Sequence, residues 1–177
     1  MNLTAKLMMT ALTHLDQKLQ KSVRLIVGGG GALLLAHHFP LSTQDINAVP
    51  TSGATIDELA PLIANVAKEL GLPNDWLNPF FSTFTHVLPP DYGTRLIDVG
   101  KFKWLKVSAL SKEDLLIMKC FAARQKDIIH ARALLKGGAD LKIVKAQIDF
   151  LKTKKIPNAD IARKFLADLE AFFEDQE

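Results

Sequence analysis

The segment RLIVGGGGALLLAHHFPLSTQDINAVP, residues 24–50, contains the pattern that decides the fold. Its first apolar run ends in four glycines, residues 28–31, and a short apolar segment over residues 32–38 follows. A second apolar run opens with Asp45-Ile46-Asn47. This order predicts a strand, a glycine turn, a short helix and a second strand. Because side chains two apart on a strand leave by the same face, Asp45 and Asn47 are expected to lie together.

Helices are predicted on both sides of this segment. Leucines at helical spacing predict an amphipathic helix over residues 3–20. Further on, residues 55–58 form a capping-box pattern that leads into a helix over residues 59–70, which Gly71 ends. Pro61 lies inside this pattern, so the helix is expected to begin later than the box implies, or to bend.

The remaining residues predict a strand pair and then four helices. Residues 75–81 are aromatic and rich in turn residues, which is typical of a loop that packs its rings on a core. Two strand candidates over residues 94–99 and 102–107 have Gly100 between them, which predicts a hairpin. Cap residues Ser111, Asp127 and Asp140, and the pair Pro157-Asn158, predict helices over residues 112–124, 128–136, 141–153 and 159–173.

This order of elements predicts an α+β (α/β) fold with a small mixed sheet and flanking helices. We expect a sheet domain over residues 1–110 and a helical C-terminal segment over residues 111–177 that packs on it. A chain of 177 residues that is 48% hydrophobic can bury such a core without covalent cross-links.

Composition restricts where the protein works. A single cysteine, Cys120, excludes an internal disulfide and favours a reducing, cytoplasmic setting. No apolar run approaches the ~20 residues that cross a bilayer, so no membrane association is expected. The lysine excess lies after residue 100, in Lys101, Lys103, Lys106 and the run over residues 152–155. Such lysines attract phosphate, although solvated surface is their commoner role.

Three phosphate-binding patterns contain glycines at a strand-to-helix turn. The Walker pattern fails here because no Gly-Lys-Ser/Thr follows the glycines. The dinucleotide fingerprint fails because Leu33 stands where its last glycine belongs. The third pattern joins the glycine turn to the polar pair on the next strand. In it the turn holds a nucleoside triphosphate, and carboxylates hold the Mg²⁺ that bridges its phosphates.

That third pattern resembles the nucleotidyltransferase superfamily, whose signature is Gly-Gly or Gly-Ser and, about ten or more residues later, Asp-hydrophobic-Asp. The matching residues are Gly28-Gly29 and Asp45-Ile46-Asn47. More narrowly, the chain is similar to small bacterial nucleotidyltransferase-like proteins related to the AbiEii toxins of toxin–antitoxin systems. Lys119 and the block Arg124-Gln125-Lys126-Asp127 resemble the C-terminal motif of that group, and residues 75–78, Asp-Trp-Leu-Asn, resemble another of its segments.

The resemblance implies roles for the matching residues. The backbone of Gly28 and Gly29 would contact phosphate, and Asp45 would bind Mg²⁺ with Asn47 as a weakened partner. Asp98 is the candidate for a third metal-binding carboxylate. In the C-terminal block, Lys119, Arg124 and Lys126 would meet the triphosphate or an RNA-like substrate, and Asp127 would orient them. Asp45, Asn47, Lys126 and Asp127 are thus the candidate catalytic residues. Without this resemblance, helix-end charges and a helix cap explain the C-terminal block equally well.

Three departures from the family pattern bear on activity. The second metal carboxylate falls on Asn47, an expected arginine falls on Ser42, and the last aspartate of the C-terminal motif falls on His130. An amide keeps an oxygen ligand but removes a full charge, so the second metal is expected to be weak or absent.

Three hypotheses about function therefore stand. The first is Mg²⁺-NTP-dependent nucleotidyl transfer to an RNA or protein hydroxyl, in a toxin paired with an antitoxin. The second is a catalytically silent family member that binds a nucleotide or a partner protein. The third is an unrelated α/β interaction domain.

Overall fold

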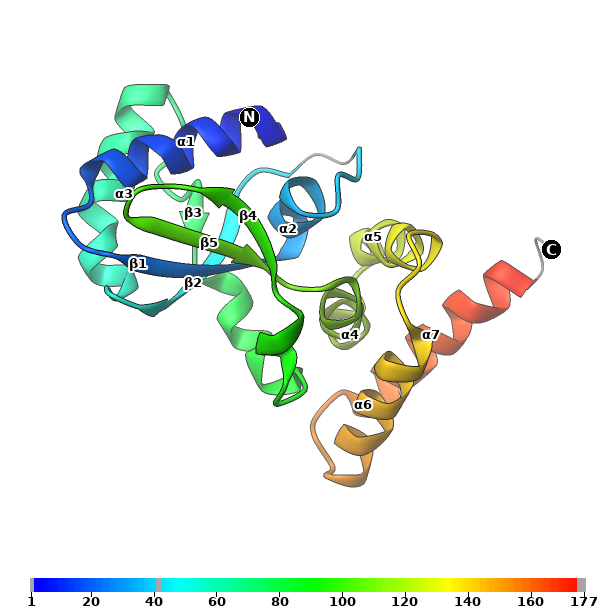
Figure 1. Cartoon of the computed structure of the whole chain (residues 1–177). Helices are drawn as coiled ribbons and strands as arrows, with labels where there is room; N and C mark the ends of the chain where they lie inside the picture. The colour runs from blue at the N-terminus through cyan, green and yellow to red at the C-terminus, as the bar shows by residue number, and fades with distance from the viewer. Residues whose placement is uncertain (1, 41–42, 175–177) are drawn as a thin grey trace. The chain divides into compact units, whose positions relative to one another are not determined.

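The computed structural model describes residues 2–40 and 43–174 (Figure 1). The chain divides into two compact units. The first contains the residues up to 83 together with 96–110, and the second contains 84–95 together with the residues from 111 on. That residues 1–110 and 111–177 form separate domains stays a prediction. No helix in the described part of the chain has both the length and the apolar character of a membrane span.

The first unit contains a mixed five-stranded sheet with the strand order β3-β2-β1-β5-β4. Its strands are β1 (Val23–Gly28), β2 (Ile46–Ser52), β3 (Leu77–Asn78), β4 (Ile97–Lys101) and β5 (Leu105–Ala109). Strand β1 pairs antiparallel with β2 and parallel with β5, while the edge strands β3 and β4 pair parallel with β2 and antiparallel with β5. The predicted mixed sheet with flanking helices is confirmed.

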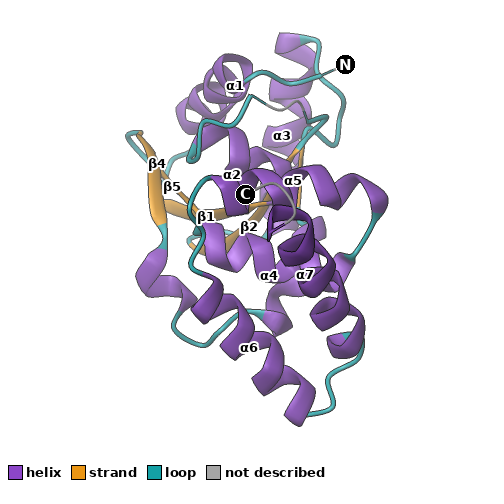
Figure 2. Ribbon diagram, turned by 90° about the vertical axis from the view of Figure 1, so that its right-hand side faces the viewer, coloured by secondary structure: helices purple, strands orange, loops and turns teal. Residues whose placement is uncertain are grey.

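Three helices form one layer of the first unit: α1 (Ala5–Lys18), α2 (Gly29–Leu35) and α3 (Ile56–Leu70) (Figure 1, Figure 2). They cover one face of the sheet, because Val23, Leu25 and Val27 of β1 are buried while Arg24 between them is exposed. Helix α3 begins at Ile56, directly after the N-cap Thr55 of the predicted capping box, and continues through Pro61, so the expected later start is wrong.

Helix α2 begins three residues before the predicted start at residue 32, because Gly29, Gly30 and Gly31 form its first turn. Glycine has a low helix propensity, so a run of glycines does not predict a helix from the sequence. Strand, turn, helix and strand nevertheless follow one another in the predicted order.

The hairpin of β4 and β5 forms, but Gly100 is not its turn. Gly100 lies within β4 opposite Val107, next to a register irregularity, and residues 102–104 connect the strands. The reason is a contact that is distant in sequence. The buried carboxylate of Asp16 in α1 accepts hydrogen bonds from the backbone N–H groups of Lys103, Trp104 and Leu105 at 2.6–3.1 Å.

The second unit is helical, as predicted for the last third of the chain. Its helices are α4 (Lys112–Ala122), α5 (Gln125–Lys136), α6 (Leu141–Thr153) and α7 (Ala159–Glu174), and α4 contacts the other three. Ser111 and Asp140 cap α4 and α6, as predicted. Asp127 is not the N-cap of α5, because the helix begins at Gln125 and Asp127 lies in its first turn.

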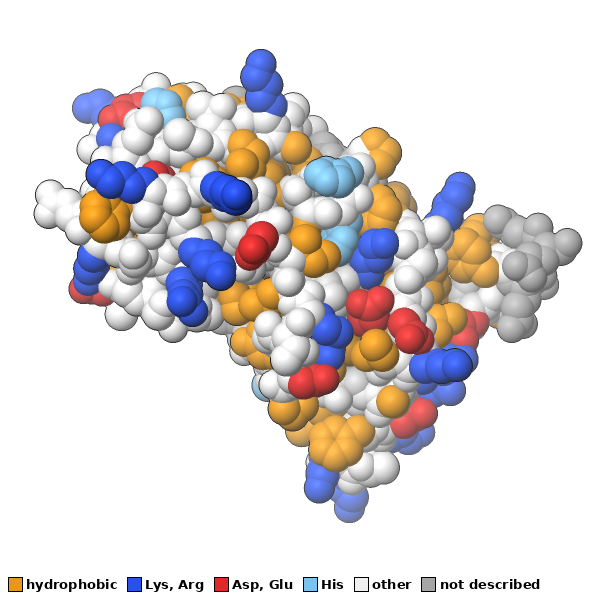
Figure 3. All heavy atoms as spheres, viewed as in Figure 1, with side chains coloured by type: hydrophobic (Ala, Val, Ile, Leu, Met, Phe, Trp, Pro, Cys, Tyr) orange, Lys and Arg blue, Asp and Glu red, His pale blue; other side chains and the backbone are white. Residues whose placement is uncertain are grey.

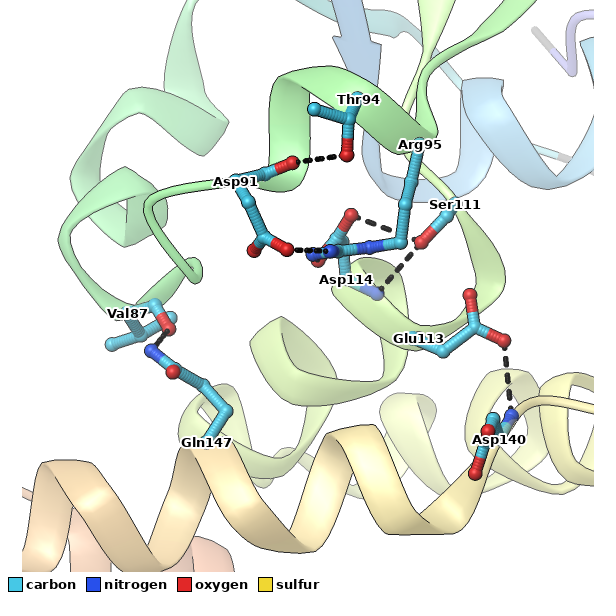
Figure 4. A network of polar contacts seen from close by, with 9 residues as sticks. All are labelled: Val87, Asp91, Thr94, Arg95, Ser111, Glu113, Asp114, Asp140 and Gln147. Carbon is cyan, nitrogen blue, oxygen red and sulfur yellow. Dashed lines mark hydrogen bonds and ion pairs between the residues drawn. The ribbon is translucent and has the colours of Figure 1, made fainter.

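Residues 84–95 join the second unit through specific polar contacts (Figure 4). Gln147 of α6 donates a hydrogen bond to the carbonyl oxygen of Val87 at 2.9 Å. The guanidinium group of Arg95 contacts Asp91 and the fully buried Asp114 of α4, each at 2.8 Å. These contacts attach an irregular segment to the helices of the second unit, and they hold residues 94 and 95 outside the strand predicted over residues 94–99, since β4 begins at Ile97.

Candidate functional site

The glycine turn connects β1 to α2 and has no side chain in its first residues. Gly29 has a φ of +59°, a left-handed conformation that favours glycine. At Gly28 a Cβ atom would lie 2.9 Å from Cγ of Phe81, so the ring packs directly on this backbone. At Gly29 a Cβ atom would lie 3.4 Å from Nδ2 of Asn47. The turn therefore lies against the polar pair, as the sequence predicts.

Asp45 lies at the centre of this polar group, one residue before β2 begins. Its Oδ1 accepts a hydrogen bond from Nδ2 of Asn47 at 3.0 Å, which confirms that the two side chains share a face. Its Oδ2 accepts a hydrogen bond from Nδ2 of Asn78 at 2.8 Å. Both oxygens of the one carboxylate at the turn are therefore engaged by amide groups.

Asn78 is the site residue that sequence reasoning missed. It is 6% exposed and lies on β3, where Leu77 and Asn78 pair with Ile46 and Asn47. Its amide orientation is fixed, because Oδ1 accepts from the backbone N–H of Phe80 while Nδ2 also donates to the carbonyl oxygen of Asp75. A strand of two residues has no periodicity to detect, so the only signal was the family-like stretch over residues 75–78.

Asp98 does not join Asp45. It lies on β4 at the opposite edge of the sheet, where its Oδ1 accepts a hydrogen bond from Ser108 at 3.3 Å. Three strand spacings, about 14 Å, separate β4 from β2. Across residues 2–40 and 43–174, no three His, Cys, Asp or Glu side chains come together at a possible metal site.

These residues fit one Mg²⁺ that arrives with a triphosphate, and they do not fit a two-metal site. Mg²⁺ is commonly held by one or two carboxylates together with substrate phosphates and water. Asp45 supplies the one carboxylate. Asn47 can supply an amide oxygen if its side-chain amide rotates by half a turn, which its single hydrogen bond to Asp45 permits. Asn78 cannot supply one in this way, since its amide has partners on both ends.

Exchange of Asn47 for aspartate tests this position. In Asn47→Asp a second carboxylate replaces the amide that now bonds Asp45 at 3.0 Å, so the two charges repel until a cation binds. We expect calorimetry to show at least tenfold tighter Mg²⁺ binding, and the melting temperature to fall in a chelator and recover with Mg²⁺. Asn158→Asp, an equal charge change in the second unit, is the control. Unchanged Mg²⁺ affinity in Asn47→Asp would show that position 47 does not face a metal.

The C-terminal block forms a buried ion pair in the second unit. Nζ of Lys119 lies 2.6 Å from Oδ1 of Asp127, and Nε of Arg124 lies 2.7 Å from Oδ2. Burial alone would raise the pKa of Asp127, but the Arg124 hydrogen bond and the Lys119 charge outweigh burial and hold that pKa below its usual range. Burial lowers the pKa of Lys119, and the nearby Asp127 charge only partly offsets this.

The geometry separates the predicted roles within this block. Asp127 is fully buried and orients both Lys119 and Arg124, whereas Lys126 is exposed. The Lys119 side chain is 8% exposed and is committed to Asp127, so its role is structural in this conformation. All four residues belong to the second unit, while Gly28, Gly29, Asp45, Asn47 and Asp98 belong to the first.

His130 lies where the family motif has its last aspartate. Burial, followed by the charge of Lys119, lowers the pKa of His130 to about 4, so the imidazole is neutral at physiological pH. Its buried Nδ1 has no hydrogen-bond partner among the described residues. The motif has therefore lost a negative charge here. Ser42, the third departure from the family pattern, lies outside the described residues.

Comparison with known proteins agrees with this geometry at the level of the family. A model of a family described as "Nucleotidyltransferase of unknown function (DUF6036)" matches residues 5–176, almost the whole chain. Searches of the curated proteins and of the solved structures gave no match. The chain therefore belongs to this family of nucleotidyltransferases of unknown function.

Proposed function

We propose that this protein binds a nucleoside triphosphate with one Mg²⁺ at the glycine turn and does not transfer its nucleotidyl group. The observation that carries this proposal is the environment of the Asp45 carboxylate at the turn. Asp45 is held between the amides of Asn47 and Asn78, so the position where the resemblance expects a second carboxylate carries a neutral amide. The described residues also contain no group of three His, Cys, Asp or Glu side chains that could hold a metal. Membership of the nucleotidyltransferase family supports the nucleotide as the ligand.

The residues at the turn have distinct tasks in this proposal. The backbone of Gly28 and Gly29 contacts phosphate, because neither residue has a side chain of its own, while the Phe81 ring packs on Gly28. Helix α2 has only seven residues, so close backbone contact contributes more here than a helix dipole. Asp45 and the amide oxygen of Asn47 hold the ion, which when bound neutralises phosphate charge. Asn78 keeps the Asp45 carboxylate in place.

Transfer requires more than these residues provide. An acceptor hydroxyl must lose its proton while its oxygen attacks the α-phosphorus and pyrophosphate leaves in line. A base must lie within hydrogen-bond reach of that hydroxyl. Asp45 is committed to the ion in this proposal, and Asn47 and Asn78, whose amides bond it, are not bases. Binding without turnover follows.

Calorimetry with each of the four nucleoside triphosphates and Mg²⁺ tests the proposal. We expect binding by the wild type and at least a tenfold loss in Asp45→Asn, which removes the charge but little volume. Asp98→Asn is the matched control, because it neutralises the carboxylate at the other edge of the same sheet and should leave affinity unchanged. Absence of binding to all four nucleotides would refute the proposal.

The second candidate is nucleotidyl transfer to an RNA or protein hydroxyl. It is favoured by Gly28, Gly29 and Asp45 at the turn and by the orientation that Asp127 imposes on Lys119 and Arg124. Under it, the resemblance to the AbiEii-related group makes the protein a toxin with an antitoxin partner. Both candidates place the protein in the cytoplasm, where nucleoside triphosphates are abundant. Radiolabel transfer from an NTP to bulk tRNA or lysate protein, lost in Asp45→Asn, would establish this candidate and overturn silent binding.

A further inference from the structure

Three cations form a row on the sheet face opposite helices α1 to α3, before the point where Ile26 and Ser108 of the same face are buried. The strand register places Arg24 of β1 beside Lys106 of β5, and Lys106 beside Lys101 of β4. Residues paired in this way project from the same face, and neighbouring strands lie about 4.8 Å apart. All three side chains are exposed. We call these three residues the cation row.

The cation row lacks acidic partners. No ion pair joins Arg24, Lys101 or Lys106 to a carboxylate in the described part of the chain. Asp98 lies on this face, one step further along the strands, and its carboxylate is bonded to Ser108. Asp16 is buried and accepts three backbone hydrogen bonds at the hairpin turn. Figure 3 shows lysine and arginine side chains gathered over this part of the sheet.

Such a row destabilises the free protein. Like charges directly opposite each other on neighbouring strands repel, and here two such pairs share Lys106. A polyanion would remove this repulsion and release its own counterions on binding. Lys103 adds a further exposed charge at the hairpin turn, where its Nζ lies 4.9 Å from the centre of the Trp104 ring.

A hollow of about 190 Å³ lies beside the cation row. Ser22, Val23 and Arg24 line one side of it, and the hairpin residues 102–106 line the other. Trp104 lines the hollow beside the lysines of the hairpin and is half-buried. The Phe102 ring instead lies near Gly100, on the side where α1 packs, because a Cβ at Gly100 would lie 3.3 Å from it and 2.9 Å from Met9. A cationic surface beside an aromatic ring is the arrangement that holds phosphates while a base stacks on the ring.

We propose that the cation row and this hollow bind single-stranded nucleic acid, with phosphates on Arg24, Lys106 and Lys101 and a base against Trp104. A duplex keeps its bases stacked inside and offers none to the hollow. A membrane surface favours exposed apolar side chains, whereas the exposed side chains of residues 101–106 are lysines. The site requires no nucleotide at the glycine turn, so it stands or falls independently of the proposed function.

Fluorescence anisotropy with labelled 12-mers of uridine and of thymidine, and with a duplex of the same length, tests this site. At low salt we expect the wild type to bind both single strands more tightly than the duplex. Arg24→Gln with Lys106→Gln should weaken binding at least tenfold and reduce the salt slope by about 1.4, the value for two phosphate contacts. Trp104→Ala should weaken single-strand binding about tenfold without changing the salt slope. A preference for uridine or thymidine also supports the site and identifies the natural strand.

The matched control is Lys6→Gln with Lys68→Gln, which removes two exposed charges from the helices of the same unit. An equal loss of oligonucleotide affinity in this control would show that net charge alone explains the binding, and it would overturn the proposal. No wild-type binding, or tighter binding of the duplex, would overturn it as well. So would binding to phosphatidylserine vesicles that Arg24→Gln with Lys106→Gln abolishes while oligonucleotide binding persists. Circular dichroism of each variant establishes that it is folded.

Discussion

Replacing Asp127 by alanine is expected to destabilise the second unit by about 3–5 kcal/mol, the usual cost of removing one partner of a buried ion pair. The Asp127 side chain is fully buried, and its partner Lys119 is 8% exposed. Alanine would leave the Lys119 ammonium in the interior without a counter-charge. It would also remove the acceptor for the backbone N–H of Arg124 at the start of α5.

The two units can be followed separately as the protein unfolds. Both tryptophans, Trp76 and Trp104, lie in the first unit, whereas helices α4 to α7 make the second unit the main source of the helical circular dichroism signal. In urea we expect the dichroism midpoint of Asp127→Ala to fall strongly. The tryptophan midpoint shows whether the first unit unfolds with the second or remains folded.

Two variants provide the comparison for Asp127→Ala. Asp160→Ala breaks the exposed ion pair between Lys152 and Asp160 and should leave stability unchanged. Lys119→Met should cost less than Asp127→Ala, because Asp127 keeps Arg124 as a partner and the methionine fills the space apolarly. If Asp127→Ala left stability intact but abolished nucleotide binding, the residue would serve ligand binding and not the stability of the second unit.

Local signals were sufficient for much of the fold. Helix α6 begins and ends where Asp140 and the apolar spacing predict, and Ser111 caps α4 as its sequence context implies. The order of elements around the glycine turn also follows from residues 24–50 alone. In each case the deciding interaction lies within a few residues of the element that it defines.

The parts that the sequence could not predict depend on residues far apart in the chain. The hairpin turn is displaced because Asp16 binds the N–H groups of residues 103–105. Asn78 reaches Asp45, 33 residues before it in the chain, because β3 pairs with the start of β2. Asp98 could be chosen as a third carboxylate only while the strand order was unknown, since β1 and β5 separate its strand from β2. Long-range pairing thus decides which polar residues share a site.

Replacing Arg95 by methionine is expected to have the second large effect, about 3 kcal/mol. Figure 4 shows Arg95 between Asp91 and Asp114, and the Asp114 side chain has no solvent exposure. Without the guanidinium group, Asp114 keeps the Ser111 hydroxyl at 2.9 Å but has no counter-charge. Asp91→Ala is the matched control, since it removes only the partner that is 65% exposed and should cost well under 1 kcal/mol.

Arg95→Met should also loosen residues 84–95, because the Arg95–Asp114 ion pair and the Gln147–Val87 hydrogen bond attach this segment to the helices. Hydrogen exchange should therefore increase first in residues 84–95 and in the first turn of α4, while α6 and α7 stay protected. Arg95→Lys should lose an intermediate amount, because an ammonium group cannot form the planar fork that reaches both carboxylates. If Arg95→Met and Asp91→Ala were equally mild, Asp114 would be stabilised chiefly by the Ser111 cap. Residues 84–95 would then be held mainly by the hydrogen bond from Gln147, and Gln147→Leu would be the variant that loosens them.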